Sequence, residues 1–476
     1  MKKILSVILA LCMAFGLAAC GAAPAAEVPA GKPSPLPAGQ GGQMGGGSGP
    51  VQAFTASYFL SGPSVKEGAQ YPSEEAYQNK DGSFDWEAYS KAQDLWYKAQ
   101  GARAEAGAAV KEKLYPYIEN MIPALCEGCK EKNFAASPSN IFIALAMLAE
   151  ITGGQSRQQI LDAIGMPDIE TARECAAALW QANYIDDGVI KSLPSASVWV
   201  NSNARIKQEI LSTLAQYYYA SVWQGDPKDQ GFCNAFKVWL DEQTGGLLKD
   251  QIESLDSFDE DMILTLATTI YFKAPWADEF LKSLTETGIF HAEDGDAKTD
   301  FMQGGFTGSV YFGDGFAAIR KSFTNCGAMW FILPDEGTSA GSLLRGGEVT
   351  DFFEKEKSGQ RYKVVFKVPR FDVTATIDLG PVMNALGISD VFDPQVSDFS
   401  PLTADDAFVS EATHSARVKI DEEGVEAAAF TVIMVEATAM MEEPPVYEFI
   451  CDRPFIFAIE GQDGLPLFIG TVEDVR

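Results

Sequence analysis

The sequence predicts an α+β fold with large, mostly antiparallel β-sheets. Helical patterns come first in the folded part of the chain, and many short segments rich in β-branched and aromatic residues follow them, bounded by Gly, Pro and Asp. The later helical patterns sit between strands without alternating with each one. This order disfavours repeated βαβ units and therefore a parallel sheet.

Three helices are expected before the strands begin. Residues 85–98 place four aromatic or leucine side chains near helical spacing. A second helix is expected over residues 110–127, where Pro116 and Pro123 favour a break or kink. The third covers residues 140–151 and is apolar nearly all round, so we expect it to be buried.

The expected strands share a short length and a high content of β-branched and aromatic residues. In chain order they are residues 196–202, 263–272, 308–313, 328–334, 362–368, 372–377 and 455–461. Helical candidates at residues 232–246 and 379–388 separate some of them.

The first twenty residues have the order of a secretory signal. Two lysines precede an apolar run from Ile4 to Leu17, and small residues follow it. The run is shorter than the roughly 20 residues that a membrane helix needs. The ending LAAC resembles a bacterial lipobox, so residues 1–20 are interpreted as a lipoprotein signal peptide with Cys20 as the lipid anchor. The alternative is an ordinary signal peptide whose cleavage site lies beside a cysteine.

The chain divides into further segments after the signal. Residues 21–53 are dense in Gly, Pro and Ala and are expected to form a flexible tether. Residues 54–107 form an N-terminal extension, partly helical, that packs on the main body or on a partner. Residues 108–476 form the main domain. This organisation predicts a secreted protein held at the outer face of a bacterial membrane only through its lipid.

Composition excludes several functions. The net charge of −30 argues against nucleic acid, which needs clustered Lys and Arg, and is better explained by solubility than by attraction of a basic partner. The only histidines, His291 and His414, cannot form a His-rich metal centre, and a Ser/His/Asp triad would need one of them. Cys126 and Cys129 form a lone CxxC, which is an incidental helical feature, a local disulfide or a redox pair. We expect no cofactor, no metal and a monomer.

Several segments resemble, in order, the motifs of the serpin family from about residue 108 to the C-terminus. They are NFAASPSNIFIALAML, TLATTIYFKAPWADEF, VPRFDVTATIDL, FVSEATHSARVKIDEEGVEAAAF and DRPFIFAIEGQDGLPLFIGTV. The resemblance implies a serpin fold, with three β-sheets, surrounding helices and an exposed reactive-centre loop at about residues 424–445. It also implies a serine-type endopeptidase inhibitor, not an enzyme, whose partner is a protease captured as a covalent acyl complex.

The resemblance assigns shutter and breach roles to Ser137, Trp276 and His414, and gives His414 a structural role. The chain departs from the family in two places. Asn140 stands where most serpins have a serine, and Thr268 stands where they have an asparagine. Both side chains can form hydrogen bonds, so we expect a polar cluster with Ser137 and His414.

Residues 425–437 have the pattern of a β-strand with one uncharged face. One row carries Val425, Ala427, Ala429, Thr431, Ile433, Val435 and Ala437, and the other carries Glu426, Ala428, Phe430, Val432, Met434 and Glu436. The first row can enter a crowded interior, where a charge would cost several kcal/mol. The family hinge corresponds to Glu422, Gly424, Val425, Glu426, Ala427, Ala428 and Ala429. The alternative is a buried edge strand that never moves.

The scissile bond is harder to place. The family spacing of fourteen residues from Gly424 gives Thr438–Ala439, which we favour, whereas counting back from Phe449 gives Met440 or Met441. None of these is Arg or Lys, so a trypsin-like target is disfavoured. Elastase-, subtilisin- or chymotrypsin-like proteases fit better, and a cysteine protease is an open alternative. The competing hypotheses are a non-inhibitory serpin-fold surface or binding lipoprotein and, with less support, a lipoprotein enzyme or solute receptor.

Overall fold

A computed structural model describes residues 3–5, 57–63, 69–255, 257–325, 327–355, 358–425 and 444–476. The tether at residues 21–53 and the lipid-anchor residue Cys20 lie outside these ranges. Of the interpreted signal peptide, only Lys3–Leu5 are described, as strand β1, which pairs in parallel with β14 (Ala407–Val409).

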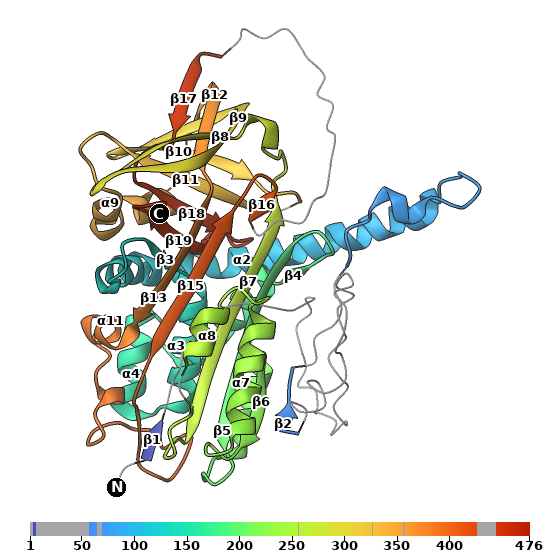
Figure 1. Cartoon of the computed structure of the whole chain (residues 1–476). Coiled ribbons are helices and arrows are strands. Elements are labelled where there is room, and N and C mark those ends of the chain that lie inside the picture. The colour runs from blue at the N-terminus through green and yellow to red at the C-terminus, as the bar shows by residue number, and fades with distance from the viewer. Residues whose placement is uncertain are drawn as a thin grey trace.

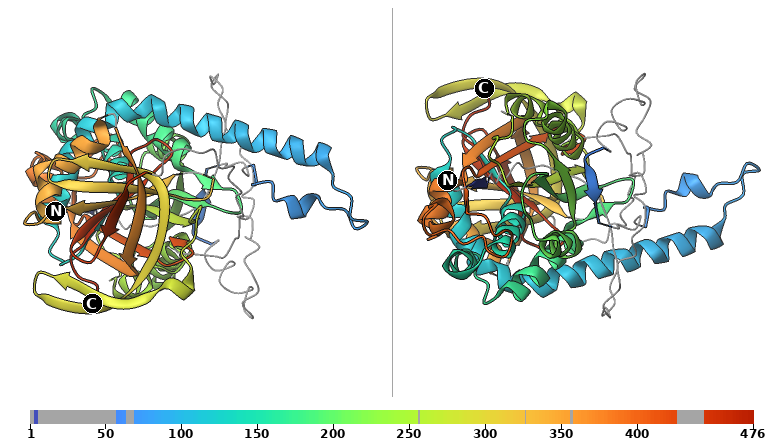
Figure 2. Two further views of the ribbon diagram at one scale, coloured as in Figure 1. Left: turned by 90° about the horizontal axis from the view of Figure 1, so that it is seen from above. Right: turned by 90° about the horizontal axis from the view of Figure 1, so that it is seen from below.

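Helix α2 (Trp86–Gly128) is a single helix of 43 residues, which begins where the Asp85 side chain accepts a hydrogen bond from the Ala88 N–H. It runs through the expected boundary at residues 107 and 108, and it does not break at Pro116 or Pro123. The expectation of two separate helices was therefore wrong. Because the residues from 110 to 126 bury an apolar face in the core, tertiary packing offsets the hydrogen bonds lost at the prolines. The first half of α2 projects beyond the sheets (Figures 1 and 2).

The main sheet has eight strands. Its spatial order is β13 (Phe371–Asp378), β15 (Thr413–Ile420), β16 (Gly424–Val425), β7 (Leu264–Pro275), β5 (Lys191–Asn201), β6 (Ala220–Gly225) and β2 (Phe59–Ser61), with β4 (Ile185–Asp186) on β5. All of these pairs are antiparallel except β5 with β6. Strand β2 belongs to the expected N-terminal extension, so part of that extension joins the main sheet.

The second sheet has nine strands. Its order is β17 (Val446–Ile450), β12 (Gln360–Pro369), β9 (Gly295–Gly313), β10 (Phe316–Ser322), β11 (Ala328–Pro334), β18 (Phe455–Glu460), β19 (Pro466–Val472) and β3 (Phe134–Ala136), with β8 (Glu286–Ala292) on β9. Strand β9 pairs with β8 and β12 along most of its length and with β10 at its end. Three sheets were expected, and β9 joins two of them into this single nine-stranded sheet.

The helices surround the two sheets. The α-helices after α2 are α3 (Pro138–Ile151), α4 (Gly154–Ala163), α5 (Ile169–Asn183), α6 (Gln208–Tyr217), α7 (Gln230–Gln243), α8 (Lys249–Ser254), α9 (Ala340–Gly346), α10 (Glu348–Glu354) and α11 (Leu379–Ala385). Short 3₁₀ turns are η1 (Glu74–Tyr77), η2 (Lys282–Leu284) and η3 (Asp390–Phe392). Within the described ranges, no helix is both long and apolar enough to cross a membrane.

Helix α3 is buried along its whole length, as its composition predicts. Its N-cap is Ser137, whose side chain accepts a hydrogen bond from the Asn140 N–H, and Pro138 occupies the first helical position, where a missing N–H costs nothing. The helix packs against β7 behind the main sheet in the view of Figure 1. This places the residues around Ser137 directly beneath the centre of that sheet.

The N-terminal extension packs on the main body. The indole N–H of Trp96 donates to the Asp187 carboxylate at 3.1 Å, and the Tyr71 N–H donates to the Asp187 carbonyl oxygen at 2.7 Å. At the start of α2, by contrast, Trp86 is 71% exposed and packs its ring against Phe84.

Candidate functional site

The main sheet is incomplete between β7 and β15. The two residues of β16 lie between them at one end, where Val425 pairs with Ile420 of β15 and with Ala274 of β7, and Gly424 pairs with Pro275. In the described part of the chain, no ladder joins β7 directly to β15. Because backbone N–H and C=O groups need partners, the facing edges of these strands form an opening that suits one more strand.

The turn that leads into β16 is held by the segment after β7. The backbone N–H of Trp276 donates to Glu423 and its indole N–H donates to Asp421, both to carbonyl oxygens at 2.9 Å. The Phe280 N–H donates to the Glu422 carbonyl oxygen at 3.0 Å. A side chain at Gly424 would place its Cβ 2.2 Å from the Ala274 carbonyl oxygen, so the close approach of the two strands requires glycine there.

Glu422 is a buried anchor beneath this turn. It is 2% exposed, and it accepts hydrogen bonds from Arg370 at 2.6 Å and from the Thr285 hydroxyl at 2.5 Å. Burial acts to raise the pKa of the Glu422 carboxyl, but the bonds from Arg370 and Thr285 outweigh it and hold the pKa below its usual value. The first residue of the expected hinge is therefore fixed by a charged pair.

The shutter residues meet at the centre of the main sheet, where β7, β15 and the start of α3 come together. Ser137, Asn140, Thr268 and His414 are all 0–1% exposed. The Ser137 N–H donates to Nε2 of His414 at 3.1 Å, which leaves the proton on Nδ1. Burial lowers the pKa of His414 to about 3, so its ring is neutral at physiological pH.

The expected polar network is only partly made. Nδ1 of His414, the hydroxyl of Thr268 and both amide atoms of Asn140 are buried without a hydrogen-bond partner among the described residues. The neighbouring Thr269 hydroxyl is in the same state. An unsatisfied buried polar group costs about 1–3 kcal/mol, so the centre of the sheet carries a local energetic penalty.

Most of the loop lies outside the described residues. This applies to the hinge members Glu426, Ala427, Ala428 and Ala429 and to the scissile-bond candidates Thr438, Ala439, Met440 and Met441. Val425, the first member of the uncharged row, is described and is 3% exposed. The next described residues begin at 444 and lead into β17, which pairs in parallel with β12.

Sequence reasoning missed the groups that hold the hinge. Arg370 and Thr285 are 52 and 137 residues away from Glu422, and nothing in their local sequence marks them as its partners. Asp421 was also missed, although Asp is a common turn residue whose side chain bonds the backbone two residues further on: its carboxylate accepts from the N–H groups of Glu423 and Gly424 at 2.9 and 3.3 Å.

Other candidate groups lie away from this site. Cys126 and Cys129 are free thiols, and burial raises the pKa of both, to about 12 for Cys129, so neither is a reactive thiolate at neutral pH. His291 is exposed and bonds Asp296 at 2.8 Å. Within the described ranges, no group of three or more His, Cys, Asp or Glu residues could hold a metal ion.

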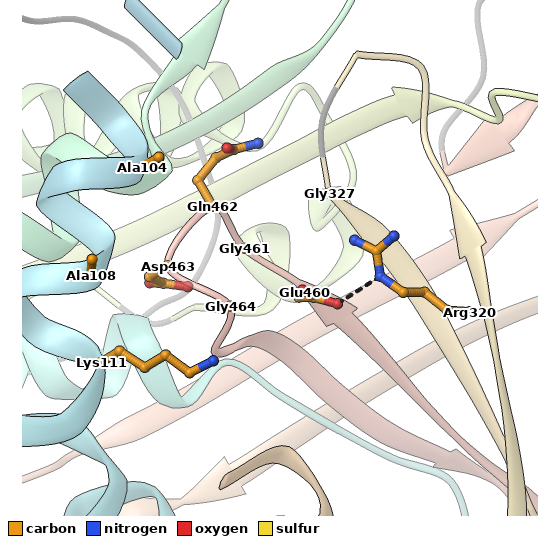
Figure 3. A pocket seen from close by; sticks show the side chains of 10 residues that line it. All are labelled: Ala104, Ala108, Lys111, Arg320, Gly327, Glu460, Gly461, Gln462, Asp463 and Gly464. Carbon is orange, nitrogen blue, oxygen red and sulfur yellow. Dashed lines mark hydrogen bonds and ion pairs between the residues drawn. The ribbon is translucent and has the colours of Figure 1, made fainter. Parts of the chain in front are cut away.

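A surface pocket of about 290 Å³ lies between α2 and the β18–β19 turn (Figure 3). Arg320 points into it and donates from Nε to Glu460 at 3.0 Å, and Lys111 reaches it from α2. Because both signs of charge meet there and the expected hinge, shutter and breach residues do not line it, we assign the pocket no role in the loop chemistry.

Comparisons with known proteins agree with this architecture. A family model described as Serpin (serine protease inhibitor) matches residues 120–475. Serpin-Z10 of Arabidopsis thaliana is 30% identical over 362 residues, which cover 72% of this chain and 91% of that protein. The thermophilic serpin Tengpin in its native state has a TM-score of 0.67 at 24% identity, covering 76% of this chain and 94% of its own. Arabidopsis AtSerpin1 in its native stressed conformation has a TM-score of 0.63 at 24% identity, covering 77% of this chain and 98% of its own. The expected fold is confirmed.

Proposed function

The chain belongs to the serpin family, and from this premise we propose that it inhibits a protease as a suicide substrate whose cleaved loop inserts into the main sheet. The observation that carries the proposal is the position of β16. It starts a new strand between β7 and β15, antiparallel to both, and the chain leaves it toward the uncharged row of residues 425–437.

The two ladders of β16 agree on where an inserted loop would lie. Val425 is opposite Ala274 on β7 and Ile420 on β15. Six residues further along the loop is Thr431, and six residues back along the two partner strands are Thr268 and His414. An uninterrupted insertion would therefore place Thr431 between the two shutter residues, with its side chain on their face of the sheet.

Thr431 is the only member of the uncharged row that has a hydrogen-bonding side chain. Its hydroxyl can donate to one group and accept from another. The orphaned groups at the shutter offer both kinds, because neutral His414 carries a proton on Nδ1 and the Asn140 amide presents an oxygen and a nitrogen. Insertion would thus relieve the penalty at the centre of the sheet and complete the missing ladder.

The chemistry needs no catalytic residue from this chain. The protease nucleophile attacks the carbonyl carbon of the scissile residue, the amine of the following residue leaves with a proton from the protease, and an acyl-enzyme remains. Insertion of the free loop end then carries the protease with it and distorts it before water can hydrolyse the ester or thioester. Inhibition requires insertion to be faster than that hydrolysis.

We place the scissile bond at Thr438–Ala439, with Met440 and Met441 as alternatives. Small and apolar residues around the bond favour elastase-, subtilisin- or chymotrypsin-like targets. We also propose that Cys20 carries a lipid that holds the inhibitor at the outer face of a bacterial membrane. Serpin-Z10 and AtSerpin1 are plant proteins, so this proposal depends on the N-terminal sequence alone.

The deciding experiment incubates the chain with elastase, subtilisin, chymotrypsin and trypsin and separates the products by denaturing electrophoresis. We expect a covalent complex with at least one of the first three enzymes, and mass spectrometry of the released C-terminal peptide then identifies the scissile bond. If every protease cuts the loop and none is trapped, the chain is a non-inhibitory serpin. Cys20→Ala should separately abolish incorporation of labelled fatty acid.

A further inference from the structure

Lys321 is a buried cation beside the segment that holds the hinge. It lies on β10, is 9% exposed, and donates from Nζ to the Asp278 carbonyl oxygen at 2.5 Å. Its Nζ also lies 4.4 Å from the ring centre of Phe280 and 5.5 Å from that of Trp276. A charged ammonium is attracted to the faces of aromatic rings, most strongly where water is excluded.

The groups that Lys321 contacts are the ones that bind the hinge turn. Trp276 and Phe280 make three hydrogen bonds to carbonyl oxygens of residues 421–423, as described above. The end of β10 is fastened to the same segment, because the Ala277 N–H donates to the Ser322 carbonyl oxygen at 3.0 Å. A change in the charge of the Lys321 ammonium can therefore alter the position of residues 276–280 and, through their hydrogen bonds, that of the hinge turn.

We propose that Lys321 is a positioning residue for loop insertion: its charged ammonium fixes residues 276–280 against the hinge turn, and loss of that charge speeds insertion. The inference rests on the proposed function, which supplies the insertion step. It assigns Lys321 no contact with the protease and no part in the cleavage chemistry.

The surrounding charges do not fix Lys321 in its protonated form. Several ionisable groups lie on the segments packed around it. They are Asp278 and Glu279 after β7, Asp421, Glu422 and Glu423 in the hinge turn, and Arg370 and Lys282, which pair with two of these. In the described structure, the hydrogen bond from Nζ goes to a carbonyl oxygen and not to a carboxylate. Burial lowers the pKa of Lys321 to about 8, and Asp278 opposes the shift.

The sign of the pH effect follows from that value. Below about pH 8 Lys321 is charged and the hinge segment is held, and above it the contact with the rings is lost. The free energy of unfolding of the whole chain, by contrast, increases as the pH rises. The folded chain releases this proton at a lower pH than the ordinary lysine value of 10.5, so folding becomes progressively more favourable as the pH rises from about 8 to 10.5. Faster insertion at high pH would therefore not reflect general unfolding.

The test uses the uncleaved chain and a synthetic peptide of residues 425–437 as the inserting strand, so that no protease contributes its own pH dependence. The insertion rate is followed between pH 6.5 and 9 as the gain in heat resistance. For the wild type we expect a several-fold increase with a midpoint near pH 8. Lys321→Arg, charged throughout, should stay slow, and Lys321→Met, never charged, should be fast at every pH.

Arg320→Met is the matched control, because Arg320 lies next to Lys321 on β10 and points into the pocket of Figure 3. It should keep the wild-type pH profile. A wild-type profile in Lys321→Met, or no pH dependence in the wild type, would overturn the inference.

Tryptophan fluorescence of the uncleaved chain gives a second readout. A transition between pH 7 and 9 is expected in the wild type and in neither Lys321 variant, and its absence from the wild type contradicts the inference. If the peptide fails to insert at any pH while the fluorescence transition appears, the insertion mechanism fails and the contact of Lys321 with Trp276 stands.

Discussion

In the second sheet, β10, β11, β18 and β19 each pair with a neighbour on both sides, whereas in the main sheet β7 and β15 are joined only through the two residues of β16. Strands β11 and β18 of the second sheet bury apolar side chains, such as the fully buried Phe331 and Phe457. The centre of the main sheet instead buries the unsatisfied atoms of Asn140, Thr268 and His414.

This difference indicates which of the two sheets has more to gain from an added strand. Strands that are paired on both sides and pack apolar side chains have little to gain from rearrangement. A sheet that has an opening and orphaned polar groups gains both ladder hydrogen bonds and side-chain partners when a strand enters. The second sheet is therefore expected to act as a rigid scaffold, while the main sheet changes.

The largest effect is expected from a charge in the uncharged row that we propose enters the main sheet. Thr431→Arg should reduce the yield of covalent complex to near zero and turn the chain into a substrate, because burying an unpaired charge costs several kcal/mol. Denaturing electrophoresis after incubation with an active protease that the wild type inhibits measures the yield of covalent complex. Val432→Arg, in the opposite row, is the matched control and should keep most of the wild-type yield of covalent complex. Equal yields from Thr431→Arg and the wild type would refute the insertion argument.

A cavity in the second sheet should affect both forms of the protein equally. Phe331→Ala removes a fully buried ring and should lower the free energy of unfolding by about 3–5 kcal/mol. Denaturant unfolding of the intact and the loop-cleaved chain measures the loss. The two losses should match, because the proposed insertion leaves this sheet unchanged, and a loss confined to the intact chain would show that the second sheet also rearranges.

Acid should release the anchor of the hinge. Since the pKa of Glu422 is lowered, its contribution to stability is complete above the ordinary value of 4.5 and is lost as the pH falls through the lower folded-state value. Glu422→Gln should cost about 1–3 kcal/mol at pH 7 and lose this pH dependence.

Urea unfolding between pH 7 and 3 measures the effect of Glu422→Gln. The comparison variant is Glu423→Gln, which breaks a more exposed pair with Lys282 and should cost less stability than Glu422→Gln. An equal loss in the two variants would show that burial of Glu422 has no special role.

The smallest effect concerns the orphaned hydroxyl on β7. Thr268→Val keeps the shape of the side chain and removes a polar group that has no partner in the described structure, so native stability should stay the same or rise by about 1 kcal/mol. The stability gained on loop cleavage should fall. Thr265→Val, on the same strand, removes a hydroxyl bonded to Met262 and should lower native stability instead. Calorimetry of the intact and the cleaved chain measures the stability of each form and so distinguishes Thr268→Val from Thr265→Val.

Many features of this molecule can be predicted from the sequence because they depend on the pattern of neighbouring residues. Alternation along residues 425–437 separates an uncharged row from an acidic one without reference to any neighbour. The glycine at 424, the apolar helix after Ser137 and most strands follow from local signals as well. The structure agrees with the helix and the strands, and adds that Gly424 is required by its contact with Ala274.

The tertiary structure decided what depends on distant segments meeting. Prolines in α2 suggested a break, but burial of one helix face against the core kept the helix whole. The pairing of Glu422 with Arg370 and the contact of Lys321 with Trp276 join residues far apart in the chain, and neither has a local sequence signal. The proposed alignment of Thr431 with His414 likewise follows from the two ladder registers of Val425, which hydrogen bonds between strands determine and which composition cannot.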